Sequence, residues 1–484
     1  MPGYEMVVGL EVHVQLATKT KLFCACPTDG SAAPPNSRIC PLCTGQPGTL
    51  PVLNRSAVEL AFQTALALNC QIAPVSVFAR KSYFYPDLPK AYQISQYERP
   101  FATDGWLELP AGEAPGKRIR IRRIHLEEDA GKLLHAAGSR ELDCSWIDFN
   151  RGGVPLVEIV SEADLRSPEE TASYLKTLKE IVQYIGASRC DMEKGEMRCD
   201  ANISLRPAGS TVLGTRAEIK NLNSLRAVKD ALAHEFQRQK QILDSGARVA
   251  QETRLWDPDR TATAAMRSKE EAEDYRYFPD PDLPPLAAGA AWVNELKAKL
   301  PELPAARRAR LRKDFGLGAT DAEVLTSQRA LADYFEAAAR GRRPPAAKTA
   351  ANLIATELLA RLNAESLAAD CARINPAELG ALAALVADGA LSSRGAKTAF
   401  AAMWEGGGAA AEVVAALGLA QVSDDGQLRA WVAAALAANP QALADLKAGR
   451  SQALGALVGA AMKLSRGKAN PELLNCIIRE SARA

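Results

Sequence analysis

Residues 6–16 read MVVGLEVHVQL, a stretch in which apolar and polar side chains alternate. One face would carry Leu10, Val12, Val14 and Leu16, and the other Gly9, Glu11, His13 and Gln15. A period of two residues predicts a β-strand with one face in the core and the other turned to a cleft or to solvent. Because parallel strands are covered on both faces and read as continuous apolar runs, this pattern favours an antiparallel sheet.

Three further segments alternate in the same way, over residues 117–124, 199–206 and 215–220. Helices intervene between such segments. The sequence Ser167-Pro168-Glu169-Glu170 has the form of a capping box with proline at the first helical position, and Gly186 would end that helix. The predicted fold class is therefore α+β, with a largely antiparallel sheet.

The composition changes near residue 290. All four histidines and most tyrosines lie upstream, whereas the downstream part is rich in Ala and Leu at helical spacing. The proline-rich segment 274–286 predicts an extended boundary, and Glu405-Gly406-Gly407-Gly408 predicts a second break. We therefore expect a mixed domain over 1–290, a helical domain over 291–405 and a small helical tail over 410–484.

Overall composition excludes several classes of protein. The 484 residues are 47% hydrophobic and 24% charged, which rules out a disordered or fibrous chain. A net charge of +2 gives no global attraction to nucleic acid, so any RNA contact must come from local patches. No apolar run approaches the roughly 18 residues that span a bilayer, and the first residues show no basic leader. The sequence predicts a cytoplasmic location without membrane contact.

Four of the ten cysteines are closely spaced. Cys24-Ala-Cys26 is followed by Cys40-Pro-Leu-Cys43, with turn-forming residues between the two pairs. Two thiolate pairs joined by a short loop suit a structural Zn²⁺ site, so we expect a zinc knuckle over 24–43. Redox or incidental thiols are the alternative. The six scattered cysteines are expected to be small buried residues.

Acidic residues occur at three separate places. Glu11 and His13 share one face of the first predicted strand, residues 125–132 read HLEEDAGK, and Glu158 lies within an apolar run. An ionised carboxylate in such a run needs a cation or a donor as its partner. If these groups converge, they would suit Mg²⁺; if they do not, they are solvent-facing polar side chains. The sequence contains no Walker A loop, which excludes a P-loop nucleotide site.

Residues 81–96, KSYFYPDLPKAYQISQ, combine tyrosines, prolines and lysines. They could form ordinary core and loop, or the wall of a polar cleft.

These and further motifs carry a resemblance to a known family. They are GLEVHV (9–14), the 81–96 segment, HLEEDAGK (125–132), PLVEIVSE (155–162), RCDANIS (198–204), EIKNLNS (218–224), DYRYFPDPD (274–282), GALVGAAMK (455–463) and GKANP (467–471). In this order they resemble the B subunits of bacterial aspartyl/glutamyl-tRNA amidotransferases over essentially the whole chain. The resemblance implies that the first domain is a cradle with a glutamine-synthetase-like sheet.

The resemblance also implies an activity. Members of this family use ATP to phosphorylate the side-chain carboxylate of Glu on tRNA(Gln) or Asp on tRNA(Asn), and ammonia then displaces the phosphate. A glutaminase, the A subunit, would supply ammonia through a channel, and a small C subunit would hold the other two together. An aminoacyl-tRNA synthetase could join transiently. The implied cofactors are ATP and Mg²⁺; the structural Zn²⁺ comes from the cysteine spacing.

By the same resemblance, the magnesium and kinase site falls on four residues: Glu11, His13, Glu128 and Glu158. Lys81, Tyr83 and Lys90 are candidates for the ammonia route or the substrate cleft. The polar side of the sheet would add cofactor-binding groups, namely Arg198, Asp200, Asn202, Glu218 and Lys220. The tail, with Lys463, Arg466 and Lys468 near its end, would contact the outer corner of the tRNA or simply be a helical core with a basic fringe.

Two other classes of function are compatible with the sequence. The chain could be a tRNA-binding adaptor without chemistry of its own, or a free-standing ligase of the glutamine-synthetase kind that acts on a small acid. An archaeal-type relative with an inserted synthetase-like domain is disfavoured by the length of the first domain.

Overall fold

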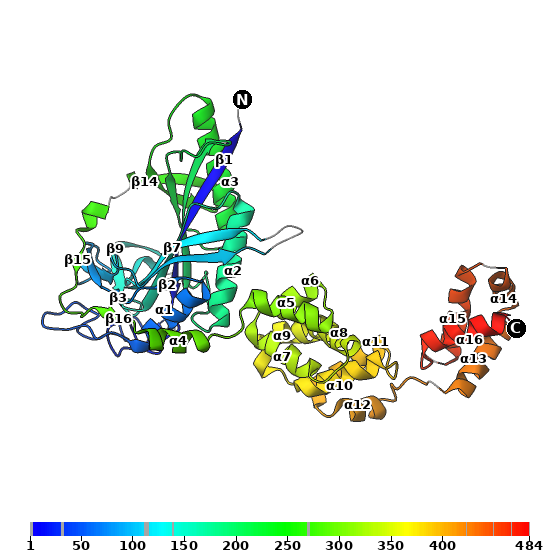
Figure 1. Cartoon of the computed structure of the whole chain (residues 1–484). Helices are drawn as coiled ribbons and strands as arrows, with labels where there is room; N and C mark the ends of the chain where they lie inside the picture. The colour runs from blue at the N-terminus through cyan, green and yellow to red at the C-terminus, as the bar shows by residue number, and fades with distance from the viewer. Residues whose placement is uncertain are drawn as a thin grey trace. The chain divides into compact units, whose positions relative to one another are not determined.

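The protein is described here by a computed structural model that covers residues 3–30, 33–110, 116–137, 140–268, 272–422, 424–448, 450–465 and 467–483. Arg466 of the predicted basic fringe lies outside these ranges. The chain divides into two units, residues 1–303 and 304–484. Figure 1 shows strands in the first unit, whereas the second consists of helices. This confirms the predicted α+β class.

A nine-stranded sheet forms the centre of the first unit, in the order β14-β13-β12-β11-β1-β10-β7-β6-β2. Its strands are β1 (Tyr4–Gln15), β2 (Gln71–Ile72), β6 (Ala102–Glu108), β7 (Arg118–Glu128), β10 (Pro155–Ser161), β11 (Met197–Pro207), β12 (Ala217–Lys220), β13 (Glu252–Asp257) and β14 (Ala262–Ser268). Apart from the parallel pair β12–β13, neighbouring strands are antiparallel. The antiparallel sheet expected from the alternating segments is confirmed.

Smaller elements complete this unit. The remaining strands are β3 (Val75–Ser76), β4 (Ala79–Ser82), β5 (Tyr92–Ser95), β8 (Lys132–Ala137), β9 (Arg140–Asp148), β15 (Phe278–Pro279) and β16 (Leu286–Ala287). The helices are α1 (Arg55–Ala67), α2 (Pro168–Tyr184), α3 (Leu225–Asp244), η2 (Ala272–Tyr275) and α4 (Ala290–Ala298). Helices α1, α2 and α3 contact strands of the large sheet and bury its apolar face. The polar face is left for the site.

Helix α2 begins where the sequence predicts. Ser167 is its N-cap and accepts a hydrogen bond from the backbone N–H of Glu170 at 3.1 Å. Pro168 occupies the first helical position, and Gly186, with φ +73°, follows the end of the helix in a conformation that favours glycine.

The first unit extends beyond residue 290, where we expected it to end. Helix α4 contacts α1, and Trp292 of α4 lies with its ring centroid 5.3 Å from that of Phe62. This apolar contact ties α4 to the core of the sheet domain, so the division falls after Leu303.

The second unit contains two apolar cores. The first gathers α5 (Pro304–Phe315), α6 (Ala319–Leu325), α7 (Arg329–Ala339), α8 (Pro344–Leu353), η3 (Ile354–Leu358), α9 (Leu359–Glu365), η4 (Ala369–Cys371), α10 (Pro376–Ala387), α11 (Ser393–Gly406) and α12 (Ala410–Ala416). The second gathers α13 (Asp425–Ala438), α14 (Pro440–Lys447), α15 (Gln452–Leu464) and α16 (Pro471–Arg483). The glycines at 406–408 do end a helix, but α12 packs in the first of these cores through Ala410 and Val414.

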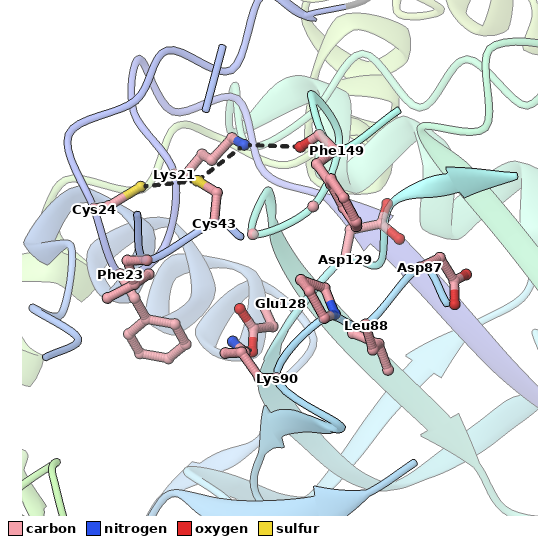
Figure 2. A pocket seen from close by; sticks show the side chains of 14 residues that line it. Lys21, Phe23, Cys24, Cys43, Asp87, Leu88, Lys90, Glu128, Asp129 and Phe149 are labelled. Carbon is pink, nitrogen blue, oxygen red and sulfur yellow. Dashed lines mark hydrogen bonds and ion pairs between the residues drawn. The ribbon is translucent and has the colours of Figure 1, made fainter. Parts of the chain in front are cut away.

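The loop between β1 and α1 carries the clustered cysteines and is fixed by a buried lysine. Lys21 is 0% exposed, and its Nζ donates to the carbonyl oxygen of Phe149 at 3.1 Å and to Sγ of Cys43 at 3.4 Å (Figure 2). This contact joins the cysteine loop to the turn that precedes β10.

Candidate active site in the polar face of the sheet

Strand register places four polar residues in one row across the sheet. His125 of β7 is opposite Glu158 of β10, Glu158 is opposite His13 of β1, and His13 is opposite Arg198 of β11. Directly opposed residues on neighbouring antiparallel strands have Cβ atoms about 5 Å apart and point to the same face. These residues are far apart in the sequence, and they lie side by side because the registers of the three strand pairs align them.

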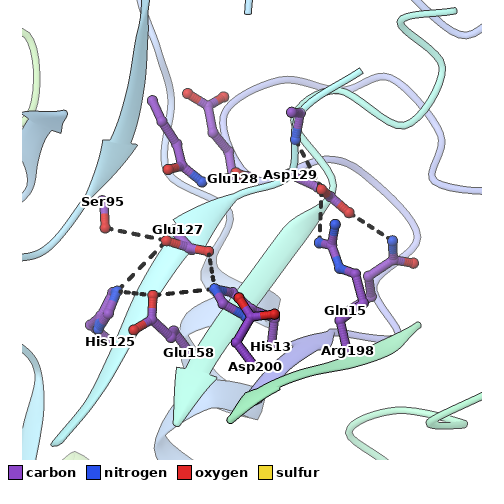
Figure 3. A network of polar contacts seen from close by, with 12 residues as sticks. His13, Gln15, Ser95, His125, Glu127, Glu128, Asp129, Glu158, Arg198 and Asp200 are labelled. Carbon is purple, nitrogen blue, oxygen red and sulfur yellow. Dashed lines mark hydrogen bonds and ion pairs between the residues drawn. The ribbon is translucent and has the colours of Figure 1, made fainter. Parts of the chain in front are cut away.

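The side chains of His125, Glu158 and His13 converge, and Glu127 joins them, whereas Arg198 reaches Asp129 instead (Figure 3). Nε2 of His13 lies 3.3 Å from Oε2 of Glu158 and 3.4 Å from Oε1 of Glu127. Ligand atoms of His13, Glu127 and Glu158 all lie within 4.8 Å of one another, which is compatible with one shared cation. Glu127 and Glu158 are 4% and 12% exposed at the side chain, whereas His13 is 21% exposed and faces the cleft.

The electrostatics of this cluster follow from buried opposite charges. Burial by itself lowers the pKa of His13, but the hydrogen bond and charge of Glu158, with Glu127, raise it to about 9. Burial opposes ionisation of Glu158 as well, yet the pKa of Glu158 lies well below its ordinary value because His125 and His13 stabilise the carboxylate. Against the effect of burial, the same two histidines also lower the pKa of Glu127, so both buried carboxylates are held ionised by their histidine partners.

A second polar group lies beside the first. Glu11 is opposite Asp200 in the register and accepts a hydrogen bond from Asn202 at 3.1 Å. Lys220 contacts Asp200 at 2.5 Å and Glu218 at 3.1 Å. Burial, followed by the charges of Glu158, Glu218 and Asp200, raises the pKa of Glu11. Lys220 is the cation that balances part of this acidic group.

Both groups line one cleft of about 1050 Å³. Of the residues predicted from the sequence, it is lined by Glu11, His13, Lys81, Tyr83, Glu158, Arg198, Asp200, Glu218 and Lys220. Asn202 joins through its contact with Glu11. Aromatic and basic groups form the rest of the wall: Lys81 lies 4.5 Å from the ring centroid of Tyr275, and Tyr97 and Tyr277 stack at 4.3 Å. A volume of this size lies at the upper end of the range usual for ligand pockets.

Glu128 does not join the cluster, contrary to expectation. Its carboxylate pairs with Lys90 and accepts a hydrogen bond from the backbone N–H of Ile94 at 3.0 Å. Both Glu128 and Lys90 line a separate small cavity beside Cys24 and Cys43 (Figure 2). Glu127 occupies the position that we expected for Glu128.

A break in strand register explains this difference. Val160 is paired with Arg123, but Ser161 is paired with Ile121, so β7 contains a bulge between these pairings. A bulge adds one residue and shifts the phase of alternation. Extending the pattern of 117–124 places Glu128 on the polar face, whereas after the bulge the polar positions are odd-numbered, as His125 and Glu127 are.

Sequence reasoning also missed His125 and Asp129. His125 is 2% exposed and contacts Glu158, and Asp129 accepts hydrogen bonds from Arg198 at 2.9 Å and from Gln15 at 2.8 Å. The apolar residues Ile124 and Leu126 on even positions were the signal, because they show that the alternation has changed phase by residue 123.

The four clustered cysteines converge as the spacing predicts. Sulfur atoms of Cys24, Cys26, Cys40 and Cys43 lie within 4.8 Å of one another, with Cys24–Cys43 and Cys40–Cys43 both at 3.7 Å. Four sulfurs about 2.3 Å from one tetrahedral zinc would lie about 3.8 Å apart, so the donor set fits that ion. A hydrogen bond from Cys24 and the charge of Lys21 lower the pKa of Cys43 to about 4.

The class of protein is given by the family models that match the sheet domain with its acidic cleft and the helical part that follows. Residues 6–294 match the family described as "GatB/GatE catalytic domain", and residues 333–481 match the "GatB domain".

Comparison with individual proteins agrees with these matches. The chain is 50% identical over 480 residues to the B subunit of the aspartyl/glutamyl-tRNA(Asn/Gln) amidotransferase of Carboxydothermus hydrogenoformans, with 99% of each chain covered. It is also 50% identical over 481 residues to the same subunit of Brevibacillus brevis, again with 99% of each covered. The chain belongs to the family of aspartyl/glutamyl-tRNA(Asn/Gln) amidotransferase B subunits. Across the described ranges, no helix has the length and hydropathy to cross a bilayer.

Proposed function

We propose that this chain phosphorylates the side-chain carboxylate of Glu on tRNA(Gln), Asp on tRNA(Asn), or both, in an ATP-dependent step, and that ammonia then converts the acyl phosphate to the amide. The observation that carries this proposal is the convergence of His13, Glu127 and Glu158 in a large polar cleft. A carboxylate resists attack by ammonia because oxide is a poor leaving group, whereas an acyl phosphate has a good one. Phosphoryl transfer needs positioning and charge neutralisation more than a protein nucleophile.

The donor set supports Mg²⁺ as the resident ion. Two ionised carboxylates supply the hard oxygen ligands that Mg²⁺ prefers, while an imidazole is a less usual partner. Because its pKa is raised to about 9 without the ion, His13 would have to lose a proton to bind Mg²⁺ directly and would otherwise contact it through a water. When bound, Mg²⁺ would neutralise the charge that develops on the transferred phosphoryl group. Glu11, which is opposite Asp200 on the β1–β11 strand pair, extends the acidic surface and would offer further carboxylate contacts to the bound cation.

The chain's own cations would hold the anionic substrates. Arg198 is fixed by Asp129 and projects into the cleft, and Lys220 is fixed by Asp200. Both side chains are therefore oriented before a phosphate binds, which reduces the entropy lost on binding. Lys81 and Tyr83, on the cleft wall, would contact the nucleotide or the aminoacyl end of the tRNA.

Ammonia must reach the acyl phosphate without protonation. Within this proposal, the A and C subunits complete a heterotrimer in which the A subunit is the glutaminase. Lys90 and Glu128 line the smaller cavity, which shares Asp129 with the cleft, and we place the end of the ammonia route there. The helices beyond residue 424 would contact the tRNA, the enzyme would work in the cytoplasm, and the cysteine cluster would hold a structural Zn²⁺.

The test uses the reconstituted complex with γ-labelled ATP and ammonium, supplied separately with Glu-tRNA(Gln) and Asp-tRNA(Asn). We expect label transfer and amide formation with at least one of them, and loss of both in Glu158→Gln, with tRNA binding retained. Transfer that survives Glu158→Gln would contradict the assignment and favour an adaptor role. Activity on free glutamate without tRNA would instead indicate a free-standing ligase.

A further inference from the structure

His125 is a buried histidine that none of the steps above uses. Its side chain is 3% exposed, and its Nε2 lies 3.2 Å from Oε2 of Glu158 and 3.6 Å from Oε2 of Glu127. Nδ1 of the same ring is buried without a hydrogen-bond partner among the described residues. Burying an unpaired N–H is less favourable than burying an unpaired lone pair, so the ring hydrogen belongs on Nε2, which then donates to Glu158.

The two histidines of the site occupy opposite sides of the carboxylates (Figure 3). His13 contacts Oε1 of Glu127 and is 21% exposed, whereas His125 is near Oε2 of the same carboxylate and, although it also lines the cleft, is only 3% exposed. Ser95 also donates to that Oε2, at 3.4 Å. Oε2 of Glu127 thus contacts Ser95 and lies near His125, whereas Oε1 faces His13.

We propose that His125 is a positioning residue, which orients Glu158 by its Nε2–H and lies against Glu127, so that the carboxylate oxygens face His13 and a divalent cation in the cleft. The inference rests on the proposed function, because it assumes that the cluster binds a cation. Outer groups that orient carboxylate ligands change metal affinity by about 10 to 100-fold when they are removed. His125 would act in this way without touching the cation.

A matched pair of substitutions tests the role of Nε2. In His125→Gln the amide nitrogen can occupy the place of Nε2, whereas in His125→Asn the shorter amide reaches only the place of Nδ1. The affinity of the full chain for Mn²⁺ is measured from the decrease of the EPR signal of the free ion. We expect this affinity to fall about 10 to 100-fold in His125→Asn and to stay close to that of wild type in His125→Gln. His135→Gln, an exposed histidine on β8, is the control and should not change affinity.

The outcomes separate the inference from the proposed function. If wild type binds no Mn²⁺, or if His13→Ala binds it as tightly as wild type does, the proposed cation site is wrong. The role of His125 is then wrong as well. If wild type binds and His125→Asn binds equally well, only the inference is overturned. If His125→Asn does not fold, pulsed EPR of Mn²⁺ bound to the wild-type protein tests the inference instead. We expect at most one coordinated imidazole nitrogen, from His13. Two coordinated nitrogens would make His125 a ligand and would overturn the inference.

Discussion

Adjacent glutamates at the end of β7 have different environments. Glu127 lies 3.4 Å from His13 inside the cleft, whereas Glu128 pairs with Lys90 in the smaller cavity. A strand directs successive side chains to opposite faces, so neighbours in sequence need not share a function. Substituting Glu127 and Glu128 in turn therefore compares the same carboxylate group in the cleft and in the smaller cavity.

We expect Glu127→Gln to reduce acyl phosphate formation by roughly 100-fold, because it removes an ionised ligand from the cation cluster. Glu128→Gln should leave Mn²⁺ affinity unchanged and reduce only the transfer of ammonia from glutamine. Initial rates with labelled ATP and Mn²⁺ titrations of both variants are the measurement. A loss of Mn²⁺ binding in Glu128→Gln, but not in Glu127→Gln, would restore the assignment made from sequence.

Lys21 is the residue on which the cysteine cluster depends for charge balance. Four thiolates and one Zn²⁺ leave a charge of −2, and the ammonium of Lys21 is buried against Cys43. We expect about one zinc per chain, and roughly tenfold faster zinc loss to a chelator in Lys21→Met. Less than half an equivalent of zinc in wild type would contradict the site, and unchanged release in Lys21→Met would contradict the role of the lysine.

At the scale of elements, strand alternation and helix caps were sufficient to predict β1, β11 and α2. Their patterns are local, since each residue's environment follows from its own strand or turn. The bulge in β7 is not local, because it depends on how β7 pairs with β10 and β6. For this reason Glu158 and His13 lie on the face that local alternation predicts, while Glu128 was assigned a position that Glu127 occupies.

Helix α3 is joined to the edge of the large sheet through Glu235. This residue is 0% exposed and accepts hydrogen bonds from Arg238, Gln239 and Thr263. Burial alone would raise the pKa of Glu235, but Arg238, Gln239 and Arg254 lower it below the ordinary 4.5. A lowered folded-state pKa means that the carboxylate stabilises the fold above about pH 4.5, and that this contribution is lost as the pH falls through the folded-state pKa.

We therefore expect Glu235→Gln to lower the free energy of unfolding of the first unit by about 2 kcal/mol at pH 7, since it removes the buried charge that accepts hydrogen bonds from Arg238 and Thr263, while Glu252 still pairs with the arginines. The difference from wild type should shrink below about pH 4.5. Denaturant unfolding across this pH range is the measurement, with the exposed Glu295→Gln as a control expected to have no effect. A difference that does not depend on pH would show that the ionised form of Glu235 is not what stabilises α3.

At the scale of the whole molecule, the first unit has one apolar core and the second has two. The cleft is built entirely from residues of the first unit. Composition was enough to separate the sheet part from the helical part, but α4 could not be assigned from sequence because its place depends on the contact of Trp292 with Phe62.

A fragment of residues 1–303 should fold and bind Mn²⁺ as tightly as the full chain, because its core and its ligands lie within that range. It should bind tRNA more weakly, since the tail is absent. Mn²⁺ titration and tRNA filter binding of fragment and full chain test this division. A folded fragment without Mn²⁺ affinity would show that the second unit completes the site.

Anomalous diffraction from crystals soaked in Mn²⁺ tests most directly whether His13, Glu127 and Glu158 share one divalent cation. We predict the strongest peak within about 2.5 Å of both carboxylates and on the cleft side of His13. A strongest peak at Glu128, or none between Glu127 and Glu158 at saturating Mn²⁺, would contradict the account.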